Sequence, residues 1–429
     1  RPASLFAMTH TPVIVDYNSS TGSNTNPSDC VASSVGTSVT ASGTDTGTTI
    51  TFGFGGSELE SLDLSGANDD DSDFIYCSTV SGRRHLFQIT AFNPSASACT
   101  SVTVAQTIDG TFSGQAWHIN GTRQSFIHDS NTDEQDWVRG WHVRLDGTFT
   151  KNGNFRPCDN DRTTVAVDDP PFILEASPSA SSRPSIEQES QFSRIWQQRE
   201  HIMIKVRGIK LFHDGPGHAS LTNIIISSGA VSFVDCVIEN TGTTQPQYLI
   251  EMGSGSRVAR MFNCYFRGGD EYVIRYNSQE HCVIDNCWFD CRGVHGTNAA
   301  VLCQGQDNVV TNTLVSEAAG AGLEFSVAGN VGRNNFWFCK NNTIADCGSH
   351  GISLTGTPSA TTSPAHTFYI VNCLLVGNGG YGANMPETSL HVETSDIDYN
   401  CLFNNSSGGY NGPSAGPNDV TITTTPFTD

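Results

Sequence analysis

The sequence predicts an all-β chain whose larger, C-terminal part is a solenoid of stacked turns. Glycine is abundant at 42 residues, charged residues make up only 15% of the chain, and a short motif recurs every 23 to 30 residues. Long runs of apolar residues with helical spacing are hard to find, which favours strands. At 429 residues the chain is long for one compact domain, so two units or a solenoid are expected.

Residues 1–20 are predicted to form an extended apolar strand. Its apolar side chains are Leu5, Phe6, Met8, Val13, Ile14 and Val15. Such a strand pairs either with its own chain or with the open sheet edge of a neighbouring copy. The sequence leaves both alternatives open, and the functional hypothesis below uses donation to a neighbour.

Residues 21–136 are predicted to form a small antiparallel β unit. Alternating stretches such as "TTITFGF" interrupt a region rich in Ser, Thr and Gly, and later short strands are broken by turns at "GANDDDSD", "VSGRR" and "FNPSAS". The first of these turns is a candidate Ca²⁺ site, because hard oxygen ligands on a loop suit that ion. Its carboxylates are Asp69, Asp70, Asp71 and Asp73, with a solvated loop as the alternative. No other cofactor is expected.

Residues 137–429 carry the repeat. An Asn or Asp stands before a small residue, with an apolar residue two places further on, at Asp235, Asn263, Asn286, Asn312, Asn342, Asn372 and Asn400. The successive spacings are 28, 23, 26, 30, 30 and 28 residues. This pattern is typical of stacked solenoid turns joined by loops of variable length.

The repeated asparagine is predicted to be a corner of each turn. Asparagine tolerates the left-handed backbone conformation, and one such residue bends a strand while both flanks still point inward. Two places after the small residue, an inward apolar column is expected to include Phe266, Ala345 and Phe403. The corner and its interior ladder comprise Asn263, Cys264, Asn286, Cys287, Asn312, Asn342, Asn372, Cys373, Asn400 and Cys401.

The 14 cysteines are even in number and none belongs to a CxxC pair, which gives no spacing signature for a zinc site. Those at the corner form either a ladder of small residues or disulfides between neighbouring turns, since stacked strands lie about 4.8 Å apart. The even count favours an oxidising, extracellular compartment.

The repeat resembles that of the pectate-lyase-like superfamily of right-handed parallel β-helices. The resemblance covers residues 137–429 and depends on the repeat, with no catalytic motif behind it. Residues 61–150, with Trp117, Ile119, Gly121 and Arg123, resemble an N-terminal module of poorly characterised bacterial and phage-encoded β-helix surface proteins. The resemblance implies that this module caps the open end of the helix, and that some similar proteins are subunits of extracellular filaments.

Charge and hydropathy exclude two classes of partner. The formal net charge is −21 and the Lys and Arg residues are scattered, so no patch is expected to collect the phosphates of a nucleic acid. No stretch approaches the roughly 18 apolar residues of a membrane span.

No catalytic residue is assigned. His350 lies in "GSHGISL", and Asp285, Asp290 and Arg292 lie in "DNCWFDCRG", but each stretch is equally an ordinary turn or corner of a β-helix. Two or three carboxylates on neighbouring turns would be needed for glycoside hydrolysis.

The main hypothesis is a secreted structural protein, not an enzyme, that assembles with itself into a fibre, filament or surface coat through its N-terminal strand. It would lie outside the cell or on a cell or virion surface. Five sequons allow glycosylation there, at Asn18, Asn120, Asn341, Asn404 and Asn405. The alternative is a β-helix protein that binds or cleaves a polysaccharide, similar to tailspikes or lyases.

Overall fold

In the computed structural model, the described residues are 13–18, 30–33, 39–55, 61–64, 74–80, 83–105, 107–108, 111–115, 117–120, 141–151, 172–188, 195–198, 203–213, 223–227, 229–242, 245–253, 258–277, 281–293, 297–304, 307–326, 335–356, 366–386, 396–412 and 414–424. Apart from one 3-10 turn, η3 (Ala96–Ala98), every described element is a strand, which confirms the all-β prediction. No helix long and apolar enough to cross a membrane occurs in these ranges.

The chain divides into two compact units. The first comprises residues 1–149, 156–159 and 166–182, and the second comprises 150–155, 160–165 and 183–429. The domain limits at residues 20 and 136 stay a prediction. Asp69, Asp70, Asp71 and Asp73 lie outside the described residues, as do Gly121 and Arg123.

The first unit holds an eight-stranded sheet of order β2-β9-β5-β6-β7-β4-β3-β8, whose pairs are antiparallel. Its strands are β2 (Cys30–Ser33), β3 (Thr40–Gly43), β4 (Thr49–Gly53), β5 (Phe74–Val80), β6 (Arg83–Asn93), β7 (Ser101–Val104), β8 (Phe112–Gln115) and β9 (Trp117–Asn120). Alternate residues of β3, β4 and β7 are buried, and Ala41, Ile50, Phe52 and Val102 contribute to one core. This is the predicted small antiparallel unit.

The N-terminal strand β1 (Val13–Asn18) pairs in parallel with β10 (Trp141–Asp146) of the same chain, with Val13 opposite Trp141. Val13, Ile14 and Val15 therefore pair within their own chain, as in the first of the two alternatives, and donation to a neighbouring copy stays a prediction. On the edge of β1 that faces β10, the backbone N–H and C=O groups are engaged in this pairing. Leu5, Phe6 and Met8 lie outside the described residues.

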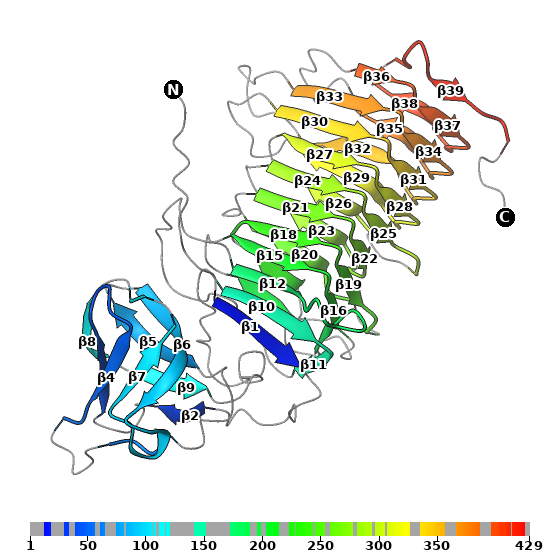
Figure 1. The fold of residues 1–429 in the computed structure, drawn as a ribbon. Helices are drawn as coiled ribbons and strands as arrows, with labels where there is room; N and C mark the ends of the chain where they lie inside the picture. The colour runs from blue at the N-terminus through cyan, green and yellow to red at the C-terminus, as the bar shows by residue number, and fades with distance from the viewer. Residues whose placement is uncertain are drawn as a thin grey trace, which may run out of the picture. The chain divides into compact units, whose positions relative to one another are not determined.

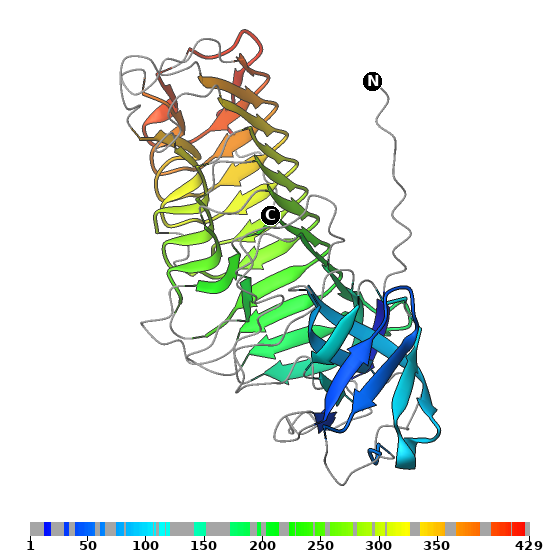
Figure 2. The same ribbon diagram turned by 90° about the vertical axis from the view of Figure 1, so that its left-hand side faces the viewer.

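The second unit is a parallel β-helix of three sheets, and the long stack of strands is visible in Figures 1 and 2. Sheet 1 contains β15 (Ile204–Arg207), β18 (Val231–Val234), β21 (Val258–Phe262), β24 (His281–Asp285), β27 (Asn308–Thr311), β30 (Asn335–Lys340), β33 (His366–Val371) and β36 (Asp396–Asp398). Within the first unit, β12 (Phe172–Ala176) pairs in parallel with β10. Sheet 2 contains β11 (Thr148–Lys151), β13 (Ser185–Gln188), β16 (Lys210–His213), β19 (Val237–Asn240), β22 (Tyr265–Arg267), β25 (Trp288–Asp290), β28 (Leu314–Ser316), β31 (Thr343–Ala345), β34 (Leu374–Val376), β37 (Cys401–Phe403) and β39 (Val420–Thr421). Sheet 3 contains β14 (Trp196–Gln198), β17 (Asn223–Ser227), β20 (Tyr248–Met252), β23 (Tyr272–Tyr276), β26 (Ala299–Cys303), β29 (Ala321–Ser326), β32 (Ile352–Thr355), β35 (Tyr381–Asn384) and β38 (Gly408–Asn411).

The helix interior is built from residues that stack on their equivalents in the next turn. Phe266 pairs with Phe289, and their rings stack with centroids 4.9 Å apart at an interplanar angle of 12°. Val315 and Ile344 continue the column, and all four side chains are fully buried. Every turn thus buries its apolar residues only against its neighbours, which is the general logic of a solenoid.

The predicted left-handed corner is confirmed at five of its seven positions. Asp235, Asn263, Asn286, Asn312 and Asn372 have φ angles between 51° and 55°. Their amides also form an exterior ladder: Asn263 donates to Asp235, Asn286 to Asn263 (3.0 Å), and Asn372 to Asn341 (2.7 Å).

The other two corner positions are off by one residue. The left-handed residues are Asn341 (φ 58°) and Tyr399 (φ 59°), whereas Asn342 and Asn400 face inward. Asn342 accepts a hydrogen bond from the Thr313 backbone N–H (3.0 Å) and donates to the Val310 carbonyl (2.8 Å), so its amide replaces the small residue of the other turns. Consequently Ile344 and Leu402, not Ala345 and Phe403, continue the apolar column.

The interior ladder therefore consists of Cys236, Cys264, Cys287, Thr313, Asn342, Cys373 and Asn400. Cys401 pairs with Leu374 and does not belong to it. All eleven cysteines with described side chains are free thiols, so the alternative of a small-residue ladder holds for them and the disulfide alternative does not. Burial raises the pKa of Cys236, Cys339 and Cys373, which keeps these thiols protonated and unreactive.

Candidate functional site

Two aromatic side chains lie side by side on the outer face of sheet 2. Tyr265 begins β22, Trp288 begins β25, and each directly follows the inward cysteine of its corner, so the strand alternation turns both side chains outward. Their rings meet edge to face, with centroids 5.1 Å apart and an interplanar angle of 79°. Trp288 is 41% exposed, although an indole of this size is usually mostly buried in a monomeric domain.

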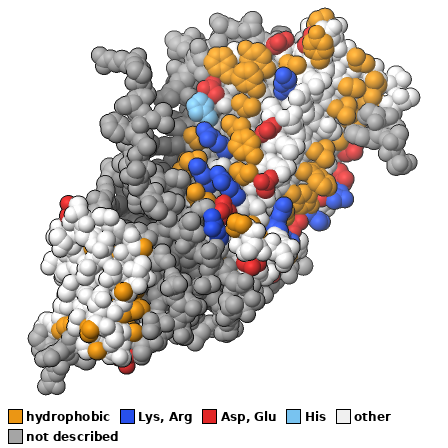
Figure 3. Space-filling view, in the orientation of Figure 1, with side chains coloured by type: hydrophobic (Ala, Val, Ile, Leu, Met, Phe, Trp, Pro, Cys, Tyr) orange, Lys and Arg blue, Asp and Glu red, His pale blue; other side chains and the backbone are white. Residues whose placement is uncertain are grey.

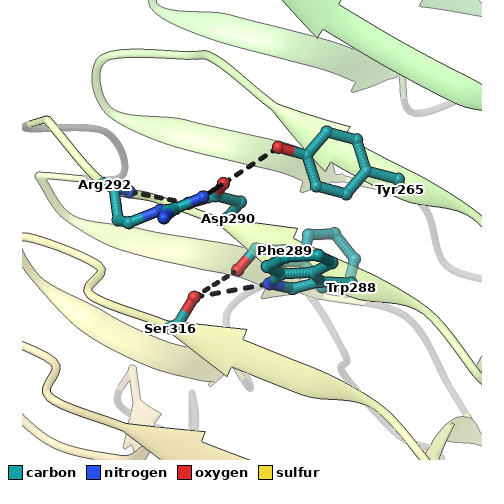
Figure 4. Close-up of polar contacts among 6 residues, drawn as sticks. All are labelled: Tyr265, Trp288, Phe289, Asp290, Arg292 and Ser316. Carbon is teal, nitrogen blue, oxygen red and sulfur yellow. Dashed lines mark hydrogen bonds and ion pairs between the residues drawn. The ribbon is translucent and has the colours of Figure 1, made fainter.

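A charged pair, Asp290 and Arg292, lies at the C-terminal end of β25 (Figure 4). Arg292 binds the Asp290 carboxylate in a bidentate manner: Nε donates to Oδ1 at 2.8 Å, and a terminal nitrogen donates to Oδ2 at 2.6 Å. The Arg292 backbone N–H also donates to Oδ1 (3.2 Å) and the Tyr265 hydroxyl donates to Oδ2 (2.9 Å). Asp290 is fully buried, whereas the Arg292 side chain is 56% exposed. We call Tyr265, Trp288, Asp290 and Arg292 the platform.

The electrostatics of the platform fix its protonation. The hydrogen bonds from Arg292 lower the pKa of Asp290 to about 2, and burial together with the Asp290 carboxylate raises the pKa of Tyr265 to about 12. The same carboxylate raises the pKa of Arg292. Near neutral pH the platform therefore presents a permanent ion pair and a protonated phenol. Neither Asp290 nor Tyr265 has the near-neutral pKa that a general acid or base needs.

Ser316 on β28 holds the indole in place, as Figure 4 also shows. Its hydroxyl accepts a hydrogen bond from Trp288 Nε1 (3.4 Å) and donates to the Phe289 carbonyl (3.5 Å). Phe289, on the opposite side of the strand, is locked in the interior stack. The platform thus stands on three successive strands whose inward residues fix its position.

The weak catalytic candidates are distributed over different parts of the helix. Asp285 accepts hydrogen bonds from the Thr311 hydroxyl and the Asn312 amide, each at 2.7 Å, so it supports the corner. His350 accepts a hydrogen bond from the Tyr381 backbone N–H (3.0 Å) and stacks on the Tyr381 ring, and burial lowers its pKa. Of the candidates named from sequence, the structure brings together Asp290 and Arg292.

A second polar network, which the sequence did not suggest, lies on sheet 3. Arg275 donates to Glu251 (3.2 Å) and to the Tyr248 hydroxyl (3.1 Å), and its guanidinium lies 4.8 Å from the centre of the Tyr248 ring. On the next strands, Glu324 accepts from the Tyr272 hydroxyl (3.4 Å) and from Thr355 (2.6 Å). Burial and Glu324 raise the pKa of Tyr272 to about 12. Every group of the network already has a partner from a neighbouring turn, which indicates a stabilising ladder.

The described residues form no metal site, and two of the sequons are engaged in hydrogen bonds. Among the residues that the structure describes, no group of three His, Cys, Asp or Glu side chains is arranged to hold a metal ion. At two sequons the amide nitrogen is already in use: Asn341 donates to Asn312 (3.0 Å) and Asn405 donates to the Leu375 carbonyl (2.9 Å). N-glycosylation replaces one of the two hydrogens on this nitrogen, so a glycan at either position would crowd a hydrogen bond that is already formed.

Comparison with known proteins identifies no family and gives distant structural likenesses. No family model matches the chain, and no curated protein matches it. Among solved structures, the catalytic domain of a GH87 alpha-1,3-glucanase in complex with tetrasaccharides is 12% identical, with a TM-score of 0.35, 83% of this chain covered and 86% of that one. The tailspike gp61 of Pseudomonas phage phi297 is 12% identical, with a TM-score of 0.26, 90% of this chain covered and 64% of that one. These scores are too low to carry an argument about function. The stacked parallel strands themselves identify the chain as a parallel β-helix protein.

Proposed function

We propose that this protein binds a polysaccharide on the outer face of its β-helix, with the platform as the central contact. The observation that carries the proposal is the exposed Trp288 indole, held next to Tyr265 and a fixed ion pair on adjacent strands. Exposed aromatic groups combined with arginine are typical of binding surfaces. The pairing of β1 with β10 in the same chain gives the structural-filament hypothesis no support, so the polysaccharide alternative is the better supported one.

The chemistry of a sugar matches these groups. The C–H face of a pyranose ring packs against the flat face of an indole, and its hydroxyl groups accept hydrogen bonds from guanidinium groups. The platform offers the exposed Trp288 indole for the first contact and the half-exposed Arg292 guanidinium for the second, while the buried Asp290 holds Arg292 in place. Since Asp290 and Arg292 are charged and oriented before a ligand arrives, little ordering of these side chains would oppose binding.

A repeating ligand also suits a repeating surface. Successive strands lie about 4.8 Å apart, so a polymer that lies along the stack meets a new outward side chain at each turn. Leu314 follows Trp288 in the same outward row, and Tyr265 precedes it. We propose binding without cleavage for the platform, because its pKa values do not suit proton transfer near neutral pH.

The test is a glycan array that carries neutral and acidic oligosaccharides, probed with the wild-type chain and with Trp288→Ala. Removal of a central indole in a binding site costs about 2 kcal/mol or more, so the signal of any bound glycan is expected to fall about thirtyfold. Tyr399→Asn is the matched control, because Tyr399 is 61% exposed, lies about four turns from Trp288, and has a φ of 59° that asparagine adopts readily. No bound glycan, or equal losses in both variants, would overturn the proposal.

A further inference from the structure

Three basic side chains gather on the outer face of sheet 1, in a chain whose net charge is −21. Lys205 and Arg207 on β15 and Arg260 on β21 occupy the outward positions of strands whose alternate residues are buried. Figure 3 shows several Lys and Arg side chains close together on one face of the helix, beside hydrophobic ones. In the described part of the chain, none of these three cations forms an ion pair or side-chain hydrogen bond.

The strand register fixes the spacing of the three charges. Lys205 lies opposite Ser232, and Ser232 lies opposite Arg260, so Lys205 and Arg260 share one row and are two turns apart. Two turns correspond to about 9.6 Å, and the two-residue step from Lys205 to Arg207 corresponds to about 6.6 Å. The backbone positions of the three cations therefore form a triangle with sides of about 6.6, 9.6 and 11.6 Å, and the side from Lys205 to Arg260 is comparable with the length of one disaccharide unit.

The buried Ser232 lies between Lys205 and Arg260, and half-buried apolar residues lie beside the charges. Val234 and Phe262 lie in the row of Arg207, and Val283 continues the row of Arg260. Two corner carboxylates near the triangle, Asp235 and Asp285, accept hydrogen bonds from asparagines or threonine and keep their negative charge. The three cations outnumber these two carboxylates, and charges elsewhere on the chain are screened beyond about 8 to 10 Å at physiological salt.

This basic triangle is continuous with the platform through one corner. Phe262 ends β21 on sheet 1, Asn263 forms the exposed corner, and Tyr265 begins β22 on sheet 2. A single extended ligand that lies over this corner can contact Arg260 on one side and Tyr265 and Trp288 on the other. Both surfaces belong to the second unit.

From this arrangement we infer that the bound polysaccharide is anionic, with carboxylates that pair with Lys205, Arg207 and Arg260. The inference rests on the proposed function, because it names the charge class of the same ligand. A guanidinium binds a carboxylate through two parallel hydrogen bonds, and the apolar residues beside the cations accommodate sugar C–H faces. One negative charge per disaccharide matches the two-turn spacing.

A carboxylated glycan fits this surface better than a nucleic acid does. A nucleic acid carries a phosphate on every nucleotide and needs many cations along its path. Three cations bounded by aromatic, aliphatic and acidic side chains would neutralise few phosphates, and the remainder would face a chain of net charge −21.

The test measures binding of the full chain to hyaluronan and alginate, two uronate polymers, and to the same polymers after their carboxyl groups are reduced to alcohols. The wild-type chain is expected to bind at least one uronate polymer at least tenfold more tightly than its reduced form. Arg260→Gln is expected to weaken uronate binding about tenfold and to leave the reduced polymer unaffected. Lys340→Gln is the matched control, because Lys340 is exposed on the same sheet three strands beyond Arg260.

Other outcomes overturn the inference and separate it from the proposed function. One such outcome is that the wild-type chain binds uronate and reduced polymers equally, and that Trp288→Ala loses this binding while Arg260→Gln keeps it. This would refute an anionic ligand and leave the proposed glycan binding intact. Tighter binding of a single-stranded DNA 20-mer than of either uronate polymer would identify a phosphate-binding surface instead. If the chain binds none of these polymers and the glycan array is also blank, both the anionic-ligand inference and the proposed function are refuted.

Discussion

On strands β22, β25 and β28 the inward residues Phe266, Phe289 and Val315 are all apolar and fully buried, whereas the outward residues Tyr265, Trp288 and Leu314 differ in size, polarity and exposure. The inward positions face the same constraint in every turn, because each must fill the space above its equivalent. The outward positions carry no such constraint. The repeat therefore identifies the scaffold, and departures from it on the outside identify the candidate site.

The largest expected effect separates the two sides of one strand. Phe289→Ala removes a buried ring from the interior stack and is expected to lower the free energy of unfolding by about 3 to 5 kcal/mol. Trp288→Ala, one residue away and facing solvent, is expected to lower it by less than about 1 kcal/mol. Urea unfolding followed by circular dichroism measures both, and similar losses would contradict the distinction between scaffold and site.

An intermediate effect is expected at the corner that joins the two sides. Asn286 has a φ of 52° and donates to Asn263, so Asn286→Ala combines backbone strain with a lost hydrogen bond, and a cost of about 1 to 2 kcal/mol is expected. Asn286→Gly is expected to cost less, because glycine adopts this conformation without strain. Urea unfolding measures both variants. If Asn286→Gly destabilises the chain as much as Asn286→Ala does, backbone strain is not the cause of the loss.

The smallest expected effect is the pH dependence of the platform. The pKa of Asp290 is about 2 in the folded chain and about 3.9 in an unfolded one, so the ionised carboxylate stabilises the fold. This contribution is complete above about pH 5 and disappears as the pH falls through about 2. The Tm difference between wild type and Asp290→Asn is therefore expected to be largest near neutral pH and to shrink on acidification. A difference that grows below pH 4 would contradict the assignment.

The sequence predicted the parts of the molecule that recur. Asn263, Asn286 and Asn372 are corners because the same local requirement returns in each turn, and that requirement leaves a pattern. The prediction was wrong by one residue at Asn342 and Asn400. At Asn342 the preceding residue is also an asparagine, and at Asn400 the left-handed residue is Tyr399, so only the hydrogen bonds of the neighbouring turns decide which residue faces inward.

The candidate site was less predictable, for the opposite reason. Asp290 and Arg292 stood out as charges within one motif, but Tyr265 and Ser316 come from turns 25 and 26 residues away from Asp290 and join it only through the strand register. The two aromatics in "NCYF" and "NCWF", at equivalent outward positions, were the available signal. The basic triangle was missed for the same reason, since Lys205 and Arg260 are far apart in sequence and adjacent only through Ser232.

Glycan contact at the platform is tested most directly by hydroxyl-radical footprinting with mass spectrometry, with and without an oligosaccharide that binds on the array. The proposed function predicts that oxidation of Trp288 and Tyr265 falls severalfold when the oligosaccharide is bound, while oxidation of Tyr399 stays unchanged. Unchanged oxidation of Trp288 beneath a bound oligosaccharide would contradict the proposal and place the ligand elsewhere on the chain.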